Sequence, residues 1–292
     1  MTADALYDTV RAEMERFFGG DARRIAHAIE VAGHARWIQA AEGGDREIVT
    51  MAGLLHDVGI KPGEERFGRN DGKIQEELGP PIAEEILRRI GVEAEKVAAV
   101  SEIIAFHHTP GRVRTKEFAC LWDADLIANL REVAGGMSRE KIDGLIEEKF
   151  LTGEGRRIAR AIHLPPPVAE LMGMRPVSCG GGGAVFEMEA GKRHHNPMGT
   201  VHGGILCDLA DAAMGYAFAT TLGPRESFTT LELKINFLRP VFETKLTASA
   251  RVVHRGRTIG LVECDVVNGE GKPVARASST CSVLRGEDAK GR

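Results

Sequence analysis

The hydrophobic period of the sequence changes once, between His163 and Pro167, and this change limits the chain to folds with two separate parts. Before it, apolar residues recur three and four positions apart, as in an amphipathic helix. After it, apolar and polar residues alternate, as in half-buried strands. Pro165 and Pro166 begin a run of three prolines that cannot continue a helix and stiffens the chain. Since 292 residues also exceed the usual size of one domain, the sequence predicts two.

The two parts predict different fold classes. Residues 1–153 predict an all-α domain, with its helices separated at Gly43-Gly44, Pro80-Pro81, Pro110-Gly111 and Gly135-Gly136. Residues 168–292 predict an α+β domain, in which one helix over 203–221 interrupts five antiparallel strands. The expected strands are 184–189, 230–237, 246–253, 260–267 and 274–283. The segment 154–167 is the expected linker.

Charge and cysteine usage restrict the partners. Residues 1–163 hold 23 basic and 29 acidic residues, a net charge of −6, and residues 164–292 hold 15 and 13, a net charge of +2. The acidic first part argues against nucleic acid as the main partner, because no basic patch can neutralise phosphates. The sequence has no uninterrupted window of 18 apolar residues, so it predicts no membrane-spanning helix. Five widely spaced cysteines predict free thiols and a cytoplasmic protein; they are Cys120, Cys179, Cys207, Cys264 and Cys281.

Histidines and aspartates in the helical part have the pattern of a metal centre. His56 and Asp57 stand side by side at the end of an apolar helix, so both reach one ion only if it lies close to that helix end. His27 precedes them by one predicted helix, and Asp125 follows two or three helices later, with Asp123 as the competing carboxylate. Two nitrogens and two carboxylate oxygens suit a divalent metal.

The ordered pattern, over roughly residues 20–150, resembles the HD-domain phosphohydrolase superfamily. The resemblance implies that His27, His56, Asp57 and Asp125 hold manganese, iron or magnesium within an all-helical bundle. It further implies metal-dependent hydrolysis of a phosphoester or nucleotide, by a bound water whose pKa the ion lowers. Relatives with two ions carry further histidines, a role open to His107 and His108. Such relatives often carry a histidine near the position of Gly79, where this sequence has the segment Gln75–Leu78 without a histidine.

A second set of residues surrounds the start of the predicted helix at Gly203. Gly203 and Gly204 leave backbone N–H groups unshielded at a helix N-terminus, which suits an oxygen that gains negative charge. Asp211 lies eight residues further, or about 12 Å along the axis, and cannot reach its own helix start. A site that uses both groups therefore needs a second copy of the chain. Asp208 is the alternative carboxylate, one turn earlier.

Residues 165–285 resemble the hotdog-fold acyl-CoA thioesterases of the phenylacetate-pathway (PaaI-like) type. The matching residues are Asn196, His202, Gly203, Gly204, Asp211, Thr230 and the segment 233–240. The resemblance implies a sheet wrapped around one helix, with the Gly203 amide as oxyanion donor and Asp211 of the facing subunit as general base or nucleophile. Asn196 and Thr230 would orient the water or the carboxylate. His202 would position the turn, touch the substrate or act as a structural cap.

Three arginines, Arg239, Arg255 and Arg257, are candidates to meet the phosphates of coenzyme A. The sequence thus predicts a bifunctional hydrolase, a homodimer or tetramer through its second domain. Two alternatives stay open: the first domain binds a metal or nucleotide without turnover and regulates the thioesterase, or the second domain only binds acyl-CoA.

Overall fold

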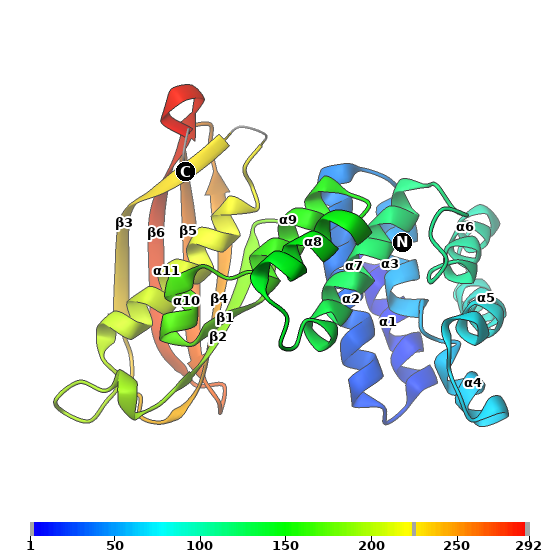
Figure 1. Cartoon of the computed structure of the whole chain (residues 1–292), viewed down its shortest axis with the longest axis horizontal. Helices are drawn as coiled ribbons and strands as arrows, with labels where there is room; N and C mark the ends of the chain where they lie inside the picture. Colours follow the sequence, from blue (N-terminus) through cyan, green and yellow to red (C-terminus); the bar gives the residue numbers. More distant parts are fainter. Residues whose placement is uncertain (1–2, 224–225, 290–292) are drawn as a thin grey trace. The chain divides into compact units, whose positions relative to one another are not determined.

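The computed structural model describes residues 3–223 and 226–289 and divides the chain into two compact units, Met1–Ala159 and Arg160–Arg292 (Figure 1). The predicted fold class, an all-α part followed by an α+β part, is confirmed. Among the described residues, no helix is long and apolar enough to cross a membrane.

The first unit is built of helices throughout. They are α1 (Ala3–Phe18), α2 (Ala22–Glu42), α3 (Arg46–Leu55), α4 (Ile60–Phe67), α5 (Gly72–Arg89), α6 (Ala94–Ala105), α7 (Lys116–Val133) and α8 (Arg139–Lys149). Side-chain caps begin several of them, because Asp21, Asp45, Asp71, Thr115 and Ser138 each accept a hydrogen bond from a backbone N–H of the first turn.

One sequence expectation for the helical part is corrected. Helix α5 passes through Pro80 and Pro81, which were expected to separate helices. The two prolines cannot donate to the carbonyls four residues earlier, a local loss that the packing of α5 on α6 outweighs. The expected linker 154–167 is helical over α9 (Gly153–His163) and begins a further short helix, α10 (Pro167–Met172).

The second unit is one antiparallel sheet with a helix across one face (Figure 1). Its strands are β1 (Met174–Gly180), β2 (Gly183–Ala190), β3 (Glu226–Phe237), β4 (Thr244–Arg255), β5 (Ile259–Asn268) and β6 (Pro273–Arg285). The order across the sheet is β1-β2-β4-β5-β6-β3, so β3 forms an edge. Helix α11 (Gly203–Ala219) buries its apolar side against the sheet; the buried residues are Leu206, Leu209, Ala210, Ala213, Met214, Ala217 and Phe218.

Strand β1 was not expected from the sequence. Pro176 lies within it, and the register shifts between Pro176 and Ser178, which interrupts the alternation. Such irregularities are tolerated because β1 is the other edge of the sheet. The glycine run after it forms the turn to β2, where Gly181 and Gly182 have positive φ.

Candidate functional site

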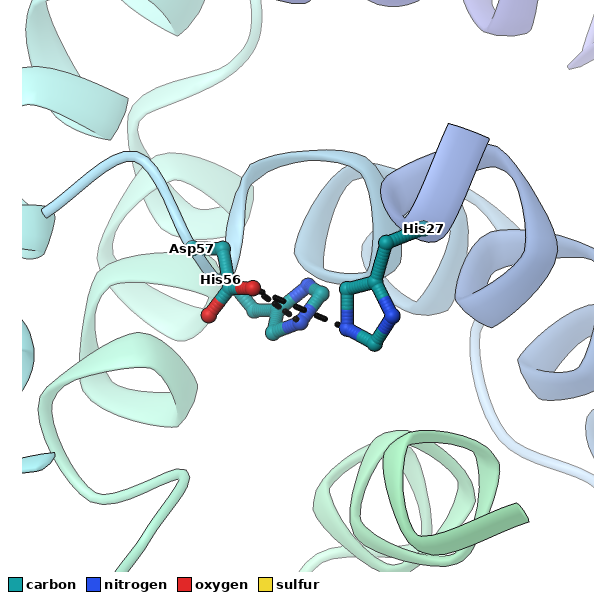
Figure 2. A group of neighbouring side chains, drawn as sticks. All are labelled: His27, His56 and Asp57. Atoms are coloured by element: carbon teal, nitrogen blue, oxygen red, sulfur yellow. Dashed lines mark ion pairs between the residues drawn. The ribbon is translucent and has the colours of Figure 1, made fainter. Parts of the chain in front are cut away.

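Three helices bring the predicted metal ligands together. His27 lies on α2, His56 and Asp57 follow the last turn of α3, and Asp125 lies on α7. Gly53 allows α2 and α3 to approach, because a Cβ at that position would lie only 2.7 Å from the Cα of Ala32. Figure 2 shows the Asp57 carboxylate and the rings of His27 and His56 pointing toward one another.

The four side chains form one cluster. His27 Nε2 lies 3.1 Å from Asp125 Oδ1 and 3.6 Å from Asp57 Oδ2. His56 Nε2 lies 3.4 Å from Asp57 Oδ2 and 3.5 Å from Asp125 Oδ1. Asp123, the competing carboxylate, points elsewhere: it is fully buried and accepts hydrogen bonds from the backbone of Leu151 and from Thr152.

The donor set fits a divalent cation. The Nδ1–H of His56 donates to the carbonyl of Gly53 at 2.9 Å, which leaves the lone pair on Nε2. That Nε2 atom is buried and has no hydrogen-bond partner. Burial lowers the pKa of His56, but the carboxylates of Asp57 and Asp125 outweigh burial and raise it to about 9. A bound cation would replace the proton at this atom.

Electrostatics keep the two carboxylates ionised. Burial by itself raises the pKa of Asp125, yet the hydrogen bond with His27 and the positive charge of the nearby His56 hold that pKa well below the ordinary value. The pKa of Asp57 is also lowered, because His56 and His107 outweigh its burial. Asn129 donates to Asp125 Oδ1 at 2.9 Å and orients it. Ionised oxygens of this kind are suitable metal ligands.

A second group of potential ligands shares Asp57. His107 Nε2 lies 3.9 Å from Asp57 Oδ1, is buried and has no hydrogen-bond partner, while its Nδ1–H donates to the carbonyl of Ile104. His108 lies beside it, with its Nε2 3.0 Å from Gln75 Oε1. The Gln75 amide donates to the carbonyl of Asn70, so its oxygen accepts from the His108 Nε2–H. Gln75 therefore orients His108.

A cavity of 640 Å³ is lined in part by His27 and Asp57. Its polar lining includes residues that the sequence analysis did not single out, among them Arg23, Arg24, Asn70 and Asn129. Arg23 is exposed and Arg24 is half-buried, and both are paired with carboxylates, so in sequence they resemble solvated residues.

The start of α11 has the geometry of an oxyanion site. Gly203 is the first residue of the helix, and His202 caps it by accepting from the Gly204 N–H at 2.8 Å. The first N–H groups of a helix have no partner within it, which leaves the Gly203 amide for a ligand. A cavity of 380 Å³ lies here, lined by Gly203, Asn196, Phe237 and Arg239 among others.

Asn196 shapes the loop that precedes this helix. Its Oδ1 accepts from the backbone of Met198 at 2.9 Å and of Thr200 at 3.3 Å, and its Nδ2 donates to the Thr200 hydroxyl. Most of its hydrogen-bonding capacity is thus used within the loop. Asn196 also lines the cavity, so these contacts fix the pocket wall, and its role in orienting the water or the carboxylate stays a prediction.

Asp211 lies on the exposed side of α11, near Thr230 of β3. Burial by surrounding atoms raises the pKa of Asp211, the Asp208 charge raises it further, and a hydrogen bond with Thr230 lowers it. Asp208 is also exposed, one turn closer to the helix start. The carboxylate is therefore presented outward, away from the Gly203 amide of its own chain.

The three arginines do not lie around one rim of a single chain. Arg239 lines the Gly203 cavity and donates to the carbonyl of Pro273. Arg255 pairs with Glu226 at 2.8 Å and lies over the ring of Phe218, in the last turn of α11, about 22 Å along the helix from Gly203. Arg257 is exposed in the turn between β4 and β5. Of the three arginines, only Arg239 lines the Gly203 cavity of its own chain, and the contact of all three with coenzyme A phosphates stays a prediction.

Comparison with known proteins assigns a family to each unit. Residues 198–275 match the family model described as the thioesterase superfamily, and residues 24–130 match that of the HD domain. The chain is 35% identical to the acyl-coenzyme A thioesterase PaaI of Escherichia coli K12 over 119 residues, which cover 40% of this chain and 82% of that protein.

Two further relatives are similar to part of the chain. The 1,4-dihydroxy-2-naphthoyl-CoA hydrolase of Listeria monocytogenes is 29% identical, over 40% of this chain and 94% of that protein. Among solved structures, the PaaI protein from the phenylacetic acid degradation operon of E. coli is 30% identical, with a TM-score of 0.42, and covers 44% of this chain and 93% of that one.

Proposed function

Because the chain belongs to the thioesterase superfamily through its second unit and carries an HD domain in its first, we propose that it is a bifunctional hydrolase. The second unit hydrolyses acyl-CoA thioesters. One observation carries this proposal: an open helix N-terminus at Gly203 in a cavity, with an outward-facing carboxylate of raised pKa at Asp211.

The chemistry follows from these two groups. The thioester carbonyl oxygen accepts a hydrogen bond from the Gly203 amide, where the helix dipole stabilises the negative charge that develops. The Asp211 carboxylate either removes a proton from the attacking water or attacks the carbonyl carbon itself. Its raised pKa makes it the stronger base. The C–S bond breaks, and coenzyme A leaves as the thiol with a proton that the water supplies. On the direct route the water then hydrolyses the acyl–Asp211 anhydride, so that both routes release a carboxylic acid.

This site requires a second copy of the chain. Asp211 lies about 12 Å along α11 from Gly203 and faces outward. Strand β3 is an edge of the sheet and exposes Leu231 and Phe237, each more than half accessible. Exposed apolar edge strands pair readily with another chain. We therefore assign the protein as a homodimer through β3 and α11, with a tetramer as the larger alternative.

Arg239 is the arginine placed to meet a coenzyme A phosphate at this cavity, since it lines the wall beside Gly203. Arg255 is already paired with Glu226. Arg257 would contribute only through the partner's site.

The first unit binds a divalent cation through His27, His56, Asp57 and Asp125 and hydrolyses a phosphoester or nucleotide. The unpartnered buried Nε2 of His56 and two ionised carboxylates support it. When bound, manganese, iron or magnesium supplies Lewis acidity toward a phosphoryl oxygen and a bound water. Arg23, Arg24 and Asn70 line the space in which the rest of the substrate would lie. In the alternative reading, this unit binds its ligand without turnover and regulates the thioesterase.

One panel tests both activities. The purified protein is assayed with short aliphatic and aryl acyl-CoAs and with nucleotides and phosphomonoesters. Asp211→Asn should abolish thioester hydrolysis, while the matched control Asp208→Asn retains it. His56→Ala should lower bound metal and phosphoester hydrolysis, while the exposed control His254→Ala changes neither. Thioester hydrolysis that survives Asp211→Asn contradicts the mechanism, and phosphoester hydrolysis that ignores chelators contradicts the metal assignment.

Subunit mixing tests the shared site. Asp211→Asn chains and Gly203→Ala chains, each disabled by itself, are co-expressed with different tags and the mixed dimer is purified. A shared site predicts that one of the two sites in the mixed dimer is intact. A mixed dimer without activity would contradict catalysis across subunits.

A further inference from the structure

The start of strand β3 carries an ion cluster of three residues. Glu226 Oε2 lies 2.8 Å from Nη2 of Arg255, and Glu226 Oε1 lies 2.5 Å from Nη2 of Arg285. Two guanidinium groups thus share one carboxylate, which leaves the cluster with one positive charge in excess. Guanidinium groups bind phosphate through several N–H donors at once. The cluster therefore has the chemistry of a phosphate site.

The cluster lies on the face of the sheet that α11 covers. Phe228 of β3 contacts Phe218 of α11, with the ring centroids 5.3 Å apart. Glu226 is two residues from Phe228 on the same strand, so its side chain is on the same face. Arg255 also lies over Phe218, 5.5 Å from the ring centroid. The cluster and the Gly203 amide are therefore on one face of the sheet, at opposite ends of α11.

Contacts between α11 and β3 show how the two elements run past each other. A Cβ at Gly203 would lie 2.8 Å from Cζ of Phe237, and a Cβ at Gly215 would lie 3.5 Å from Cζ of Phe228. Helix and strand are therefore antiparallel, and twelve residues of the helix span nine of the strand. By this proportion, the point of α11 midway between the oxyanion donor and the carboxylate lies over about Lys234.

This midpoint locates the symmetry axis of the proposed dimer. Asp211 of one chain meets the Gly203 amide of the other only if both helices lie on the same side of one continuous sheet. The two-fold axis then runs perpendicular to the sheet, so β3 pairs with the partner's β3 in the antiparallel direction, about Lys234. In this pairing the exposed Leu231 lies close to the partner's Phe237, which is also exposed. The arrangement thus covers the apolar side chains of the edge.

The same pairing brings the ion cluster of one chain to the cavity of the other. Glu226 lies eight residues before Lys234, so it lies beside the part of the partner's chain about eight residues after Lys234. That part adjoins the segment 238–241, which lines the 380 Å³ cavity at the helix start. Arg239 belongs to this segment and has no carboxylate partner among the residues that the structure describes. Three arginines from two chains therefore surround one cavity.

We propose that Arg255 and Arg285 of one chain, together with Arg239 of the facing chain, bind the phosphates of coenzyme A. Glu226 holds its two arginines in the free protein, and the phosphates replace it when coenzyme A binds. The proposal rests on the proposed thioesterase function, because the shared catalytic site places the axis. Each dimer then has two phosphate sites, and neither chain can form one by itself.

Binding of coenzyme A tests the site without turnover. Titration calorimetry on the full-length protein measures the affinity and the number of sites for coenzyme A and for pantetheine, which lacks the phosphates. Any binding by the first unit is the same in every variant. Arg251→Gln is the matched control, because Arg251 also forms an ion pair on β4 but lies next to the buried Ala250, on the other face of the sheet. The test variants each remove one charge of the proposed site; they are Arg239→Gln, Arg255→Gln, Arg285→Gln and Glu226→Gln.

Each arginine variant should weaken coenzyme A binding about 10-fold, as expected for the loss of one charge-assisted hydrogen bond to phosphate. Glu226→Gln should strengthen the binding by up to about five-fold, because the arginines no longer give up an exposed ion pair. The affinity for pantetheine should stay unchanged in all variants, and Arg251→Gln should alter neither ligand. Unchanged coenzyme A affinity in Arg285→Gln, an equal loss for pantetheine, or weaker binding in Glu226→Gln would overturn the proposal.

A mixed dimer tests whether the arginines come from two chains. One chain carries both Arg255→Gln and Arg285→Gln, and the other carries Arg239→Gln. With shared sites, one site keeps all three arginines and the other loses all three. The mixed dimer should then bind one coenzyme A with wild-type affinity. If each site used the arginines of its own chain, both sites would be weakened, and that result would overturn the proposal.

The phosphate site and the proposed function can fail separately. Coenzyme A binding with the expected pattern, in a protein that hydrolyses no acyl-CoA, would refute the proposed function alone. Hydrolysis by a protein whose arginine variants keep wild-type affinity would refute the phosphate site alone, and a monomeric wild-type protein would refute both. Thermal unfolding reports whether each variant folds. Should Arg255→Gln fail to fold, chains with Arg285→Gln and with Arg239→Gln form the mixed dimer, and the same two outcomes decide.

Discussion

Nε2 of His27 lies 3.1 Å from Oδ1 of Asp125, although 98 residues separate them in the chain. Helices α2 and α7 pack side by side to bring the two together. Asp125 also receives Nδ2–H of Asn129 from the next turn of α7. One carboxylate on one helix face is thus oriented by two groups, which leaves it preformed as a ligand.

The two aspartates of α7 should separate metal binding from stability. Asp125→Asn should lose bound metal, because the neutral amide oxygen binds a divalent cation more weakly than an ionised carboxylate does. Asp123→Asn should retain metal but lower the free energy of unfolding by about 1 to 3 kcal/mol, since its amide NH₂ would face the N–H of either Leu151 or Thr152, each of which bonds one of the two oxygens. Elemental analysis and chemical unfolding measure the two quantities. Equal metal loss in both variants would contradict the division.

Asp57 shared between two groups of histidines predicts two metal ions per chain. His107→Ala should reduce the stoichiometry from two to one, because it removes an unpartnered buried nitrogen from the second group only. Gln75→Ala should lower the affinity for the second ion about 10- to 100-fold, as expected when the partner that orients a ligand histidine is lost. Titration calorimetry on protein stripped with a chelator measures both. A stoichiometry of one in the wild type argues against the second site.

The candidate metal ligands were predictable because their chemistry is rare and their spacing follows the helices. His27, His56, Asp57 and Asp125 each stand on a predicted helix or at its end, and the structure brings the four together. The role of Gln75 was not predictable, because an amide that orients a histidine has no pattern in sequence. It depends on the packing of α5 against the segment after α6.

In the second unit, the candidate oxyanion site was predicted from the helix start at Gly203, and the sheet was predicted from the alternation of apolar and polar residues. Strand β1 was not predicted, because Pro176 and the register shift beside it interrupt the alternation of apolar and polar residues. The ion pair between Arg255 and Glu226 was also not predicted, since the two residues come from different strands. Long-range contacts of this kind follow from the strand order, which alternation does not determine.

Asp208 should set the acidic limit of thioester hydrolysis. Burial raises the pKa of Asp211 first, and the negative charge of Asp208 raises it further. Asp208→Asn removes that charge, so the pKa of Asp211 falls and the base stays ionised to lower pH. The acidic limb of the kcat/KM profile should therefore move to lower pH.

Asp208→Glu keeps the charge and serves as the control for this shift, which should be smaller at high salt because both side chains are exposed. A limb that moves to higher pH in Asp208→Asn would mean that Asp208 stabilises the ionised base.

Gly203 and Phe237 should show compensating substitutions. A Cβ at position 203 would lie 2.8 Å from Cζ of Phe237, and the backbone of Gly203 does not have the positive φ that would exclude alanine. Gly203→Ala should therefore fold, but the displaced ring and added methyl would crowd the amide. We expect a loss of about 10- to 100-fold in kcat/KM, within the range for a compromised oxyanion donor.

Phe237→Ala removes the ring that the new methyl meets, so the double variant Gly203→Ala/Phe237→Ala should recover part of the loss. Phe237 is 54% exposed and lines the cavity at the helix start, so its removal by itself should chiefly raise KM. Steady-state kinetics of the three variants with one acyl-CoA measure the coupling. Losses that simply multiply in the double variant would show that the crowding comes from another neighbour, since independent sites contribute additively to the activation free energy.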